Sequence, residues 1–253
     1  MIFLMRILFT NSTKRKTEGG AGMMDRKGAA RIKIINTACK LFNKRGVHGI
    51  GLKEISRALR VELPIVRSYF QSVDEIIELI VEPVYGEIAV ILISFLKSDL
   101  ARLYHDKKLE ILSDRLRFAD KAALYEFCDE LMEYLYAVLD YFIVNRMKLR
   151  IIMMLSLTEG KRSDGVSRIH DLFIPSAINP VFASEEAIAM SFRLPNKTTQ
   201  AMIHTVIAPL IYYAIYTDKR ALSKHADKAA RKLLLAEIRA AIDCHIEKSE
   251  IIY

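Results

Sequence analysis

The fold is decided by one stretch, residues 34–79, which reads IINTACKLFNKRGVHGIGLKEISRALRVELPIVRSYFQSVDEIIEL. Its first part places Ile34, Ala38 and Phe42 on one face of a helix that ends at Gly46. Two shorter helical patterns follow, separated by about two residues. Two short helices joined by a tight turn have the geometry that lets the second helix enter the major groove of DNA.

The second and third helices of this stretch are short. The third is too short to be stable alone, so packing must hold it in place. The apolar side chains expected to provide that packing are Leu52, Ile55, Leu59, Val61, Val66 and Phe70.

Positive charge is concentrated in the same region. Residues 26–70 contain eleven basic and two acidic side chains, a local charge of +9 in a chain of net charge +8. Residues 71–253 sum to −3. A basic head attached to a slightly acidic body is typical of a module that binds a polyanion. A solvated basic face without any partner is the alternative interpretation.

The composition predicts an all-α protein. Of 253 residues, 52% are apolar, only ten are Gly and six are Pro, and no segment alternates in the manner of a strand. We expect an N-terminal extension over residues 1–25, with Met23 or Met24 as an alternative start. A helix-turn-helix domain over residues 26–80 and a larger helical domain over residues 81–253 would follow it.

The head resembles the N-terminal domain of TetR-type bacterial transcriptional regulators. The resemblance rests on the spacing of Ala38, Phe42 and Gly46, on the Tyr69-Phe70 pair that ends the third helix, and on the acidic start of the fourth helix. It covers about a fifth of the chain. It implies a cytoplasmic homodimer that binds a palindromic operator in double-stranded DNA, acts as a repressor and is released by a small effector.

If the third helix docks as in that family, a short set of side chains faces DNA. Arg67 would bind a guanine edge or a phosphate, and Leu63 and Ile65 would touch thymine methyl groups. For Leu63 and Ile65 the alternative is that they are extra core residues. The DNA-contact residues implied by the resemblance are Lys53, Leu63, Pro64, Ile65, Arg67, Ser68 and Tyr69.

Several positions depart from the family pattern. Gly51 replaces the usual Thr or Ser cap, which would leave an N–H without a side-chain partner, and Arg60 replaces a turn glycine. Glu62 replaces a second cap and repels phosphates, Arg67 replaces an aromatic residue, and Val73 replaces a lysine. These departures support an alternative function, a TetR-like helical dimer that serves as a protein-interaction module.

The fourth helix begins with a capping box, Ser72 and Glu75, and Pro83 inside it predicts a kink or a break. Residues 76–96 are apolar enough to suggest a membrane span, but three glutamates and Pro83 would then lie in hydrocarbon. We therefore expect a helix of a protein that does not cross a membrane.

The most apolar run of the body spans residues 125–157. Aromatic and thioether side chains line apolar cavities well, so this run predicts a pocket for an apolar or aromatic effector. Core packing explains the same residues equally. The candidate pocket residues are Tyr125, Phe127, Tyr134, Phe142, Met153 and Met154.

Two long helices are expected over residues 196–216 and 223–248. Their wide apolar faces and many small residues predict a four-helix interface with a second copy, as the resemblance also implies. Packing within one chain is the alternative. The candidate interface residues are Met202, Val206, Leu210, Leu234, Ile238 and Ile242.

No catalytic or metal-binding motif is present, so we expect no enzyme, no cofactor and no metal. An unfamiliar enzyme activity in the helical body is the third interpretation. Cys39, Cys128 and Cys244 are far apart, which predicts buried free thiols, with redox sensing as an alternative role.

Overall fold

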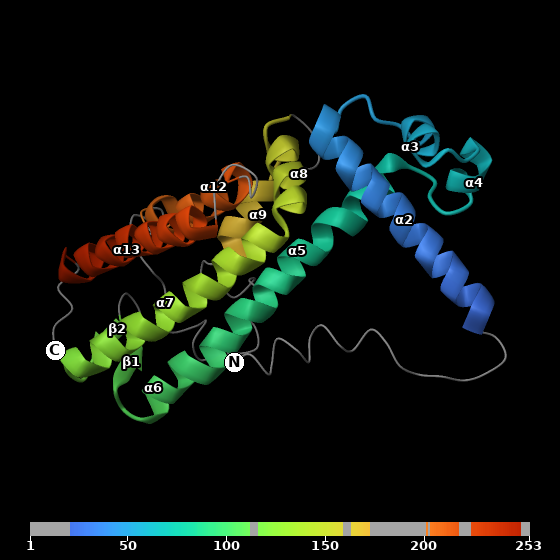
Figure 1. Ribbon diagram of the computed structural model, residues 1–253. Helices are drawn as coiled ribbons and strands as arrows, with labels where there is room; N and C mark the ends of the chain where they lie inside the picture. The colour runs from blue at the N-terminus through green and yellow to red at the C-terminus, as the bar shows by residue number, and fades with distance from the viewer. Residues whose placement is uncertain are drawn as a thin grey trace.

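The computed structural model describes residues 21–111, 116–158, 163–172, 201, 203–217 and 224–248. The chain is almost entirely helical (Figure 1), which confirms the expected all-α class. Its elements are, in order, α2 (Ala21–Arg45), α3 (Leu52–Leu59), α4 (Leu63–Arg67), α5 (Val73–Phe95), the π-helix η1 (Leu96–Leu100), α6 (Ala101–His105), β1 (Leu109–Ile111), β2 (Leu116–Phe118), α7 (Lys121–Val144), α8 (Arg146–Ser156), α9 (Gly165–Leu172), the π-helix η2 (Ile203–Ile207), α12 (Ala208–Tyr216) and α13 (Lys224–Lys248).

The head consists of α2, α3, α4 and the start of α5. Helix α2 begins at Ala21, well before the position expected from the apolar pattern, and ends where Gly46 adopts a positive φ of 83°. Residues 1–20, most of the expected N-terminal extension, lie outside the described residues. The buried core of the head is made by Ile34, Ala38, Phe42, Val47, Ile50, Ile55, Val66 and Phe70.

Helix α5 connects the head to the body. It starts beside α2 and runs the length of the body, and η1 and α6 continue it without a break (Figure 1). A kink or a break was expected at Pro83. There is no break, because the helix continues through this residue to Phe95. Its apolar face is buried against α7, α8 and α9.

Contacts from α9 surround Pro83. The Tyr85 hydroxyl donates to the carbonyl oxygen of Gly165 at 3.1 Å. The Arg168 guanidinium binds the Glu82 carboxylate with both terminal nitrogens, at 2.8 and 2.9 Å, and lies 4.0 Å from the centroid of the Tyr85 ring. Contacts between α5 and α9 therefore lie on both sides of the proline in the sequence, at Glu82 and Tyr85.

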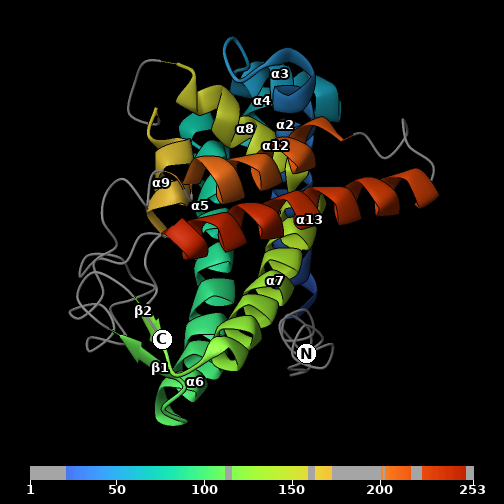
Figure 2. The same cartoon turned by 90° about the vertical axis from the view of Figure 1, so that its left-hand side faces the viewer.

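The body has two main layers. Helices α5 and α7 run side by side, and α12 and α13 lie across them on the face that Figure 2 turns toward the viewer. The stretch Val73–His105 is long and apolar enough in composition to span a membrane. Many of its apolar residues nevertheless pack into the core of this chain, whereas Leu79 and Val90 are exposed.

A short antiparallel hairpin, which the composition did not predict, lies at the end of the body far from the head (Figure 1). Leu109 pairs with Phe118, Glu110 with Arg117, and Ile111 with Leu116. The Arg117 guanidinium also forms an ion pair with the Glu110 carboxylate across the two strands. The hairpin connects α6 to α7.

Candidate nucleic-acid interface

Helix α3 begins at Gly51, which caps it without a side chain. The N–H of Gly51 donates to the Glu54 carboxylate at 2.9 Å. This hydrogen bond also holds the pKa of Glu54 below its ordinary value. No side chain caps the N–H of Glu54, as the glycine predicted, and this N–H donates to the Gly51 carbonyl at 3.1 Å. In a full capping box, the cap side chain and the side chain of the third helical residue each accept a hydrogen bond from the other residue's N–H. Only the second of these bonds is present here, because Gly51 has no side chain.

The turn between α3 and α4 is built on Arg60, which adopts the left-handed conformation at φ 57° and ψ 43°. The following N–H, of Val61, donates back to the carbonyl of Ser56 at 3.1 Å and closes the end of α3. Val61 was expected to pack α4 into the core, but its side chain is 38% exposed. The left-handed turn directs it outward, and α4 is held by other residues.

Helix α4 is attached to the head by one face. Val66 and Phe70 are buried, while Pro64, Arg67 and Ser68 are exposed. Five residues cannot form a stable isolated helix, so these two buried side chains hold α4 in position. The exposed side of α4 is therefore available to a partner.

The remaining α4 candidates divide between surface and core. Ile65 is 48% exposed, so it is not the extra core residue that was one interpretation of the sequence. Leu63 and Tyr69 are half-buried. The Ser68 hydroxyl donates to the carbonyl of Ile65 at 2.7 Å, so its donor is already used inside α4.

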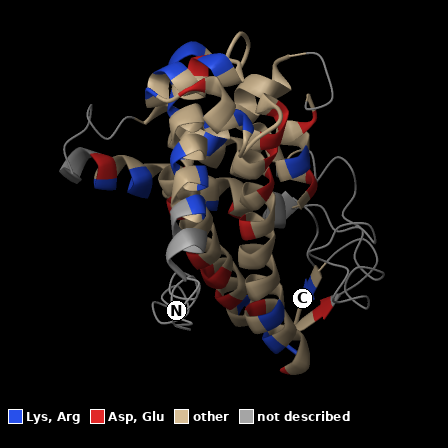
Figure 3. Cartoon of the chain, turned by 90° about the vertical axis from the view of Figure 1, so that its right-hand side faces the viewer, with Lys and Arg blue, Asp and Glu red and all other residues tan. Residues whose placement is uncertain are grey.

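Exposed basic side chains lie on α3, in the turn after it and on α4. Lys53, Arg57, Arg60 and Arg67 are all exposed, and Figure 3 shows Lys and Arg gathered over the head. Arg57 lies 3.6 Å from Glu54. In the described part of the chain, no carboxylate forms an ion pair with Lys53, Arg60 or Arg67.

The start of α5 follows the predicted capping box. The Ser72 hydroxyl accepts a hydrogen bond from the Glu75 N–H at 3.1 Å. The Glu75 carboxylate accepts from the N–H of Gln71 at 3.0 Å, one residue before the cap. Val73, which stands where a lysine was expected, is half-buried against the core. The first turn of α5 therefore presents no cation at this position.

The predicted effector residues do not form one group. Phe127 and Tyr134 both pack on Phe95, with ring centroids 6.4 and 4.9 Å away, and Phe127 also contacts Phe118 at 5.2 Å. Phe142 is fully buried on the same helix, and Met153 and Met154 are half-buried on α8. Tyr125 is 58% exposed and so lies at the surface, unlike the buried members of this set.

One of these residues carries an unpaired polar atom. The Tyr134 side chain is 8% exposed, and its hydroxyl finds no hydrogen-bond partner among the described residues. Burial raises the pKa of Tyr134 well above its ordinary value, so the hydroxyl keeps its proton. A buried donor without an acceptor costs stability and is uncommon in folded proteins.

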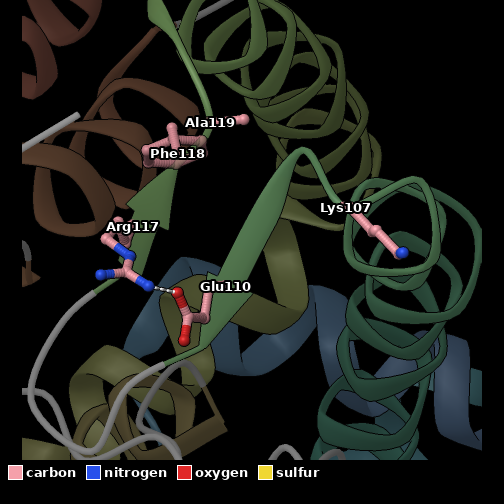
Figure 4. A pocket seen from close by; sticks show the side chains of 5 residues that line it. All are labelled: Lys107, Glu110, Arg117, Phe118 and Ala119. Atoms are coloured by element: carbon pink, nitrogen blue, oxygen red, sulfur yellow. Dashed lines mark hydrogen bonds and ion pairs between the residues drawn. The ribbon is translucent and has the colours of Figure 1, made fainter.

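A surface pocket of 280 Å³ lies beside the hairpin, away from most of the predicted residues (Figure 4). Phe118 belongs both to this pocket and to the aromatic group around Phe95. The pocket is lined by Lys107, Glu110, Arg117, Phe118 and Ala119.

The predicted contacts between copies need correction. Val206, Leu210, Ile238 and Ile242 are buried against this chain's own core, so they are unavailable to a second copy. Packing within one chain, the alternative interpretation, holds for these four. Leu234 is half-buried, and the side chain of Met202 lies outside the described residues.

The same two helices expose a different face. Tyr212 and Tyr216 on α12 are 65% and 64% exposed, and their rings contact each other at 4.5 Å between centroids. Leu233 on α13 is 63% exposed. Exposed residues of small or apolar type continue along α13 at helical spacing: Ala229, Leu233, Ala236, Ala240 and Cys244.

The three cysteines are free thiols, as expected, but they differ in burial. Cys128 is buried, Cys39 is half-buried and Cys244 is exposed, which corrects the expectation that all three are buried. Within the ranges that the structure describes, no group of three or more His, Cys, Asp or Glu side chains could hold a metal ion.

No protein-family model matches the chain, and no curated protein matches it. Two solved structures are similar to it at 12% sequence identity. One is Thermus thermophilus FadR, a TetR-family transcriptional repressor in complex with lauroyl-CoA, with a TM-score of 0.41 over 86% of this chain and 93% of that one. The other, from Mesorhizobium loti, is assigned to the TetR family of transcriptional regulators, with a TM-score of 0.35 over 88% and 97% of the two chains. At TM-scores below 0.5, these similarities do not by themselves establish a family for the chain.

Proposed function

We propose that this chain is a DNA-binding transcriptional regulator of TetR type that acts in the cytoplasm as a homodimeric, effector-released repressor. The observation that carries the proposal is the exposed side of α4, which is anchored through the buried Val66 and Phe70, together with the exposed cations of α3, of the turn and of α4. A short helix held from behind and exposed in front has the form needed to enter the major groove.

The proposed contacts follow the exposure of the side chains. Arg67 binds a guanine edge or a phosphate, Pro64 and Ile65 touch apolar groups in the groove, and Lys53 at the start of α3 binds a phosphate. Leu63 and Tyr69 contribute their exposed parts, and Ser68 acts as an acceptor because its donor is engaged. The affinity then depends strongly on salt, because lysine and arginine contacts release counterions.

The direct test is selection of bound sequences from a random double-stranded DNA pool. A palindrome is expected, with half-site centres about 34 Å apart or a multiple of that distance. Arg67→Ala should cost about 1 to 3 kcal/mol on the selected site and relax the base preference at one position. Lys97→Ala removes the same charge from an exposed site on η1, far from the head, and serves as the control. Failure to enrich any sequence at low salt would reject DNA reading.

We propose that the second copy covers the exposed face of α12 and α13. Tyr212, Tyr216 and Leu233 would lie near its centre, because exposed aromatic and leucine side chains gain most from burial. Leu233→Glu is expected to give a monomer in sedimentation experiments. Lys232→Glu, at the neighbouring exposed position, changes charge more strongly but should leave the dimer intact. Equal effects of the two variants would place the interface elsewhere.

The proposed effector is a small apolar or aromatic molecule that carries one hydrogen-bond acceptor. The aromatic group of Phe95, Phe118, Phe127 and Tyr134 supplies the apolar surroundings, and the unpaired Tyr134 hydroxyl supplies the donor. A bound effector shifts the equilibrium only if it prefers one arrangement of the helices. Tyr134→Phe should therefore weaken the response of DNA release to such compounds and leave DNA affinity in their absence unchanged.

A second candidate is a protein-interaction module. It is favoured by Glu62, which is exposed at the start of α4 and makes no capping hydrogen bond, in a position where a phosphate would be repelled. Arg67→Ala and Glu62→Ser separate the two functions. A DNA reader should lose affinity with the first and gain it with the second, whereas a protein-interaction module should show no DNA affinity to change.

A further inference from the structure

The head and the end of α12 both form hydrogen bonds with the N-terminal part of α8. The Asn43 side-chain amide, on α2 of the head, donates to the carbonyl of Met147 at 2.9 Å. On the other side, Arg150 donates to the carbonyl of Ile215 through Nε at 2.9 Å and Nη2 at 2.5 Å. Arg146 donates to the carbonyl of Thr217 at 3.2 Å. Figures 1 and 2 both show α8 between α2 and α12.

The Asn43 amide has only one orientation that fits its surroundings. Its nitrogen donates both to the Cys39 carbonyl in its own helix and to the Met147 carbonyl in α8, each at 2.9 Å. Its oxygen is buried without a partner among the described residues. Turning the amide over would set oxygen against two carbonyl oxygens. The amide therefore fixes how α2 sits on α8.

The two arginines engage the end of α12. The last carbonyls of a helix lack partners in the helix and carry the negative end of its dipole, so they attract cations. Arg150 and Arg146 reach the carbonyls of Ile215 and Thr217 at this end. Tyr216, one of the exposed aromatic residues of the proposed dimer face, lies between these two in the sequence.

The rest of α8 gives its first turn little freedom. A single residue, Asn145, separates α7 from α8, and the N–H groups of Lys148 and Leu149 donate to its carbonyl at 2.8 and 3.1 Å. Along α8, Leu149 and Ile152 are buried against the core. A movement of α12 that displaces the first turn of α8 should therefore also displace α2. A movement of α2 should displace α12 in the same way.

We propose that Asn43, Arg146 and Arg150 are positioning residues that set the angle of the head relative to the α12–α13 face. The inference rests on the proposed function for its consequence in DNA binding: in a dimer built on that face, the same three residues set the separation of the two α4 helices. They touch no DNA. Their role is to select the half-site spacing, while residues of α4 select the bases.

The angle of the head is measurable without DNA. Nitroxide labels are placed on Ala58→Cys in α3 and Glu133→Cys in α7, both exposed positions, after Cys39, Cys128 and Cys244 are replaced by Ala. An excess of unlabelled protein restricts the measurement to distances within one chain. A single narrow distance distribution is expected for the parent protein.

Asn43→Leu keeps a side chain of similar size but removes both donated hydrogen bonds, so the distribution should broaden or shift. Asn36→Leu, at an exposed position of the same helix, is the matched control and should leave it unchanged. Arg150→Lys retains the charge, loses the paired contact to Ile215 and should have the same direction of effect as Asn43→Leu. If Asn43→Leu fails to fold, Arg150→Lys provides the test by itself. Distributions that coincide for the parent, Asn43→Leu and Arg150→Lys would overturn the proposal.

The effect on DNA binding is measured by selection from the same random double-stranded DNA pool that tests the proposed function. Asn43→Leu should widen the range of accepted half-site spacings while the bases selected within each half-site stay the same, the opposite of the expected result for Arg67→Ala. Changed distances without any enriched DNA from the parent protein would reject the regulatory function and retain the positioning role. Unchanged distances together with an enriched palindrome would reject the positioning role and retain the regulatory function.

Discussion

Arg31 on α2 lies over the ring of Phe70, with its guanidinium carbon 4.8 Å from the ring centroid. The same guanidinium is 3.4 Å from the Glu75 carboxylate in the first turn of α5. One exposed side chain thus connects α2, the start of α5 and the segment between α4 and α5 that contains Phe70, the buried anchor of α4. A cation over an aromatic face is stabilised by the ring quadrupole.

Replacement of Arg31 by Leu should lower the free energy of unfolding by about 0.5 to 1 kcal/mol, since the site is exposed and the ion pair is screened by solvent. Urea denaturation followed by circular dichroism measures the change. Lys33→Leu, on an exposed position of the same helix, removes a charge without touching Phe70. If both variants lose the same stability, the contact with Phe70 contributes nothing specific.

The head was predictable from the sequence because its core residues recur at helical spacing, and Ile34, Ala38, Phe42 and Val66 are buried as that spacing indicates. The candidate site was predictable only in outline. The exposure of Ile65 and Val61 depends on a left-handed turn at Arg60, a conformation that no pattern of apolar residues encodes.

The body was harder to predict, for a different reason. A periodic apolar face indicates that a helix is buried, but it does not say which molecule buries it. Leu210 and Ile238 were therefore assigned to a second copy, although they pack inside this one. The hairpin escaped prediction because strands of three residues are too short to show an alternating pattern.

Two glycines offer a matched test of packing in the body. A Cβ at Gly165 would lie 2.9 Å from the Ser156 hydroxyl and 3.1 Å from a methyl group of Ile152. Gly165→Ala should therefore destabilise the chain, by about 1 to 3 kcal/mol. Gly86, inside α5, has open space around its Cβ position, so Gly86→Ala should stabilise by about 0.5 to 1 kcal/mol.

Thermal and urea unfolding of both variants measure these opposite effects. The same sign for both would mean that space around the backbone does not decide the outcome at these positions.

The cysteines should react with iodoacetamide in the order of their exposure. Burial raises the pKa of the Cys128 thiol to about 11 and also raises that of Cys39, so little reactive thiolate forms at neutral pH. Cys244 is exposed on α13. Mass spectrometry of the Leu233→Glu variant, in which the face of α12 and α13 is uncovered, should show modification of Cys244 first, and all three should react alike in denaturant. Early labelling of Cys128 in the native protein would contradict its burial.

His170 on α9 should make the chain less stable in mild acid. Burial, with a smaller effect from His204, lowers the pKa of His170 below its ordinary value of 6.5, while Asp171 acts in the opposite direction. As pH falls below 6.5, the unfolded chain takes up a proton before the folded chain does. The free energy of unfolding therefore decreases until the lower folded-state pKa is passed.

Urea denaturation from about pH 7.5 to about pH 5.5 measures the slope. His170→Gln should reduce it, whereas the exposed-site variant His105→Gln should not. A slope that is the same in all three proteins would assign the acid sensitivity to other groups.

The presence of Pro83 inside α5 affects how rigidly this helix connects the head to the body. Proline lacks the N–H that would bind the carbonyl of Leu79, so the helix is locally short of one hydrogen bond. The contacts of α9 with Glu82 and Tyr85 lie on either side of that residue. Support on both sides of Pro83 comes from a segment some eighty residues further along the chain. Substitutions that remove these α9 contacts should therefore make the connection between head and body more flexible while the helical content of α5 stays the same.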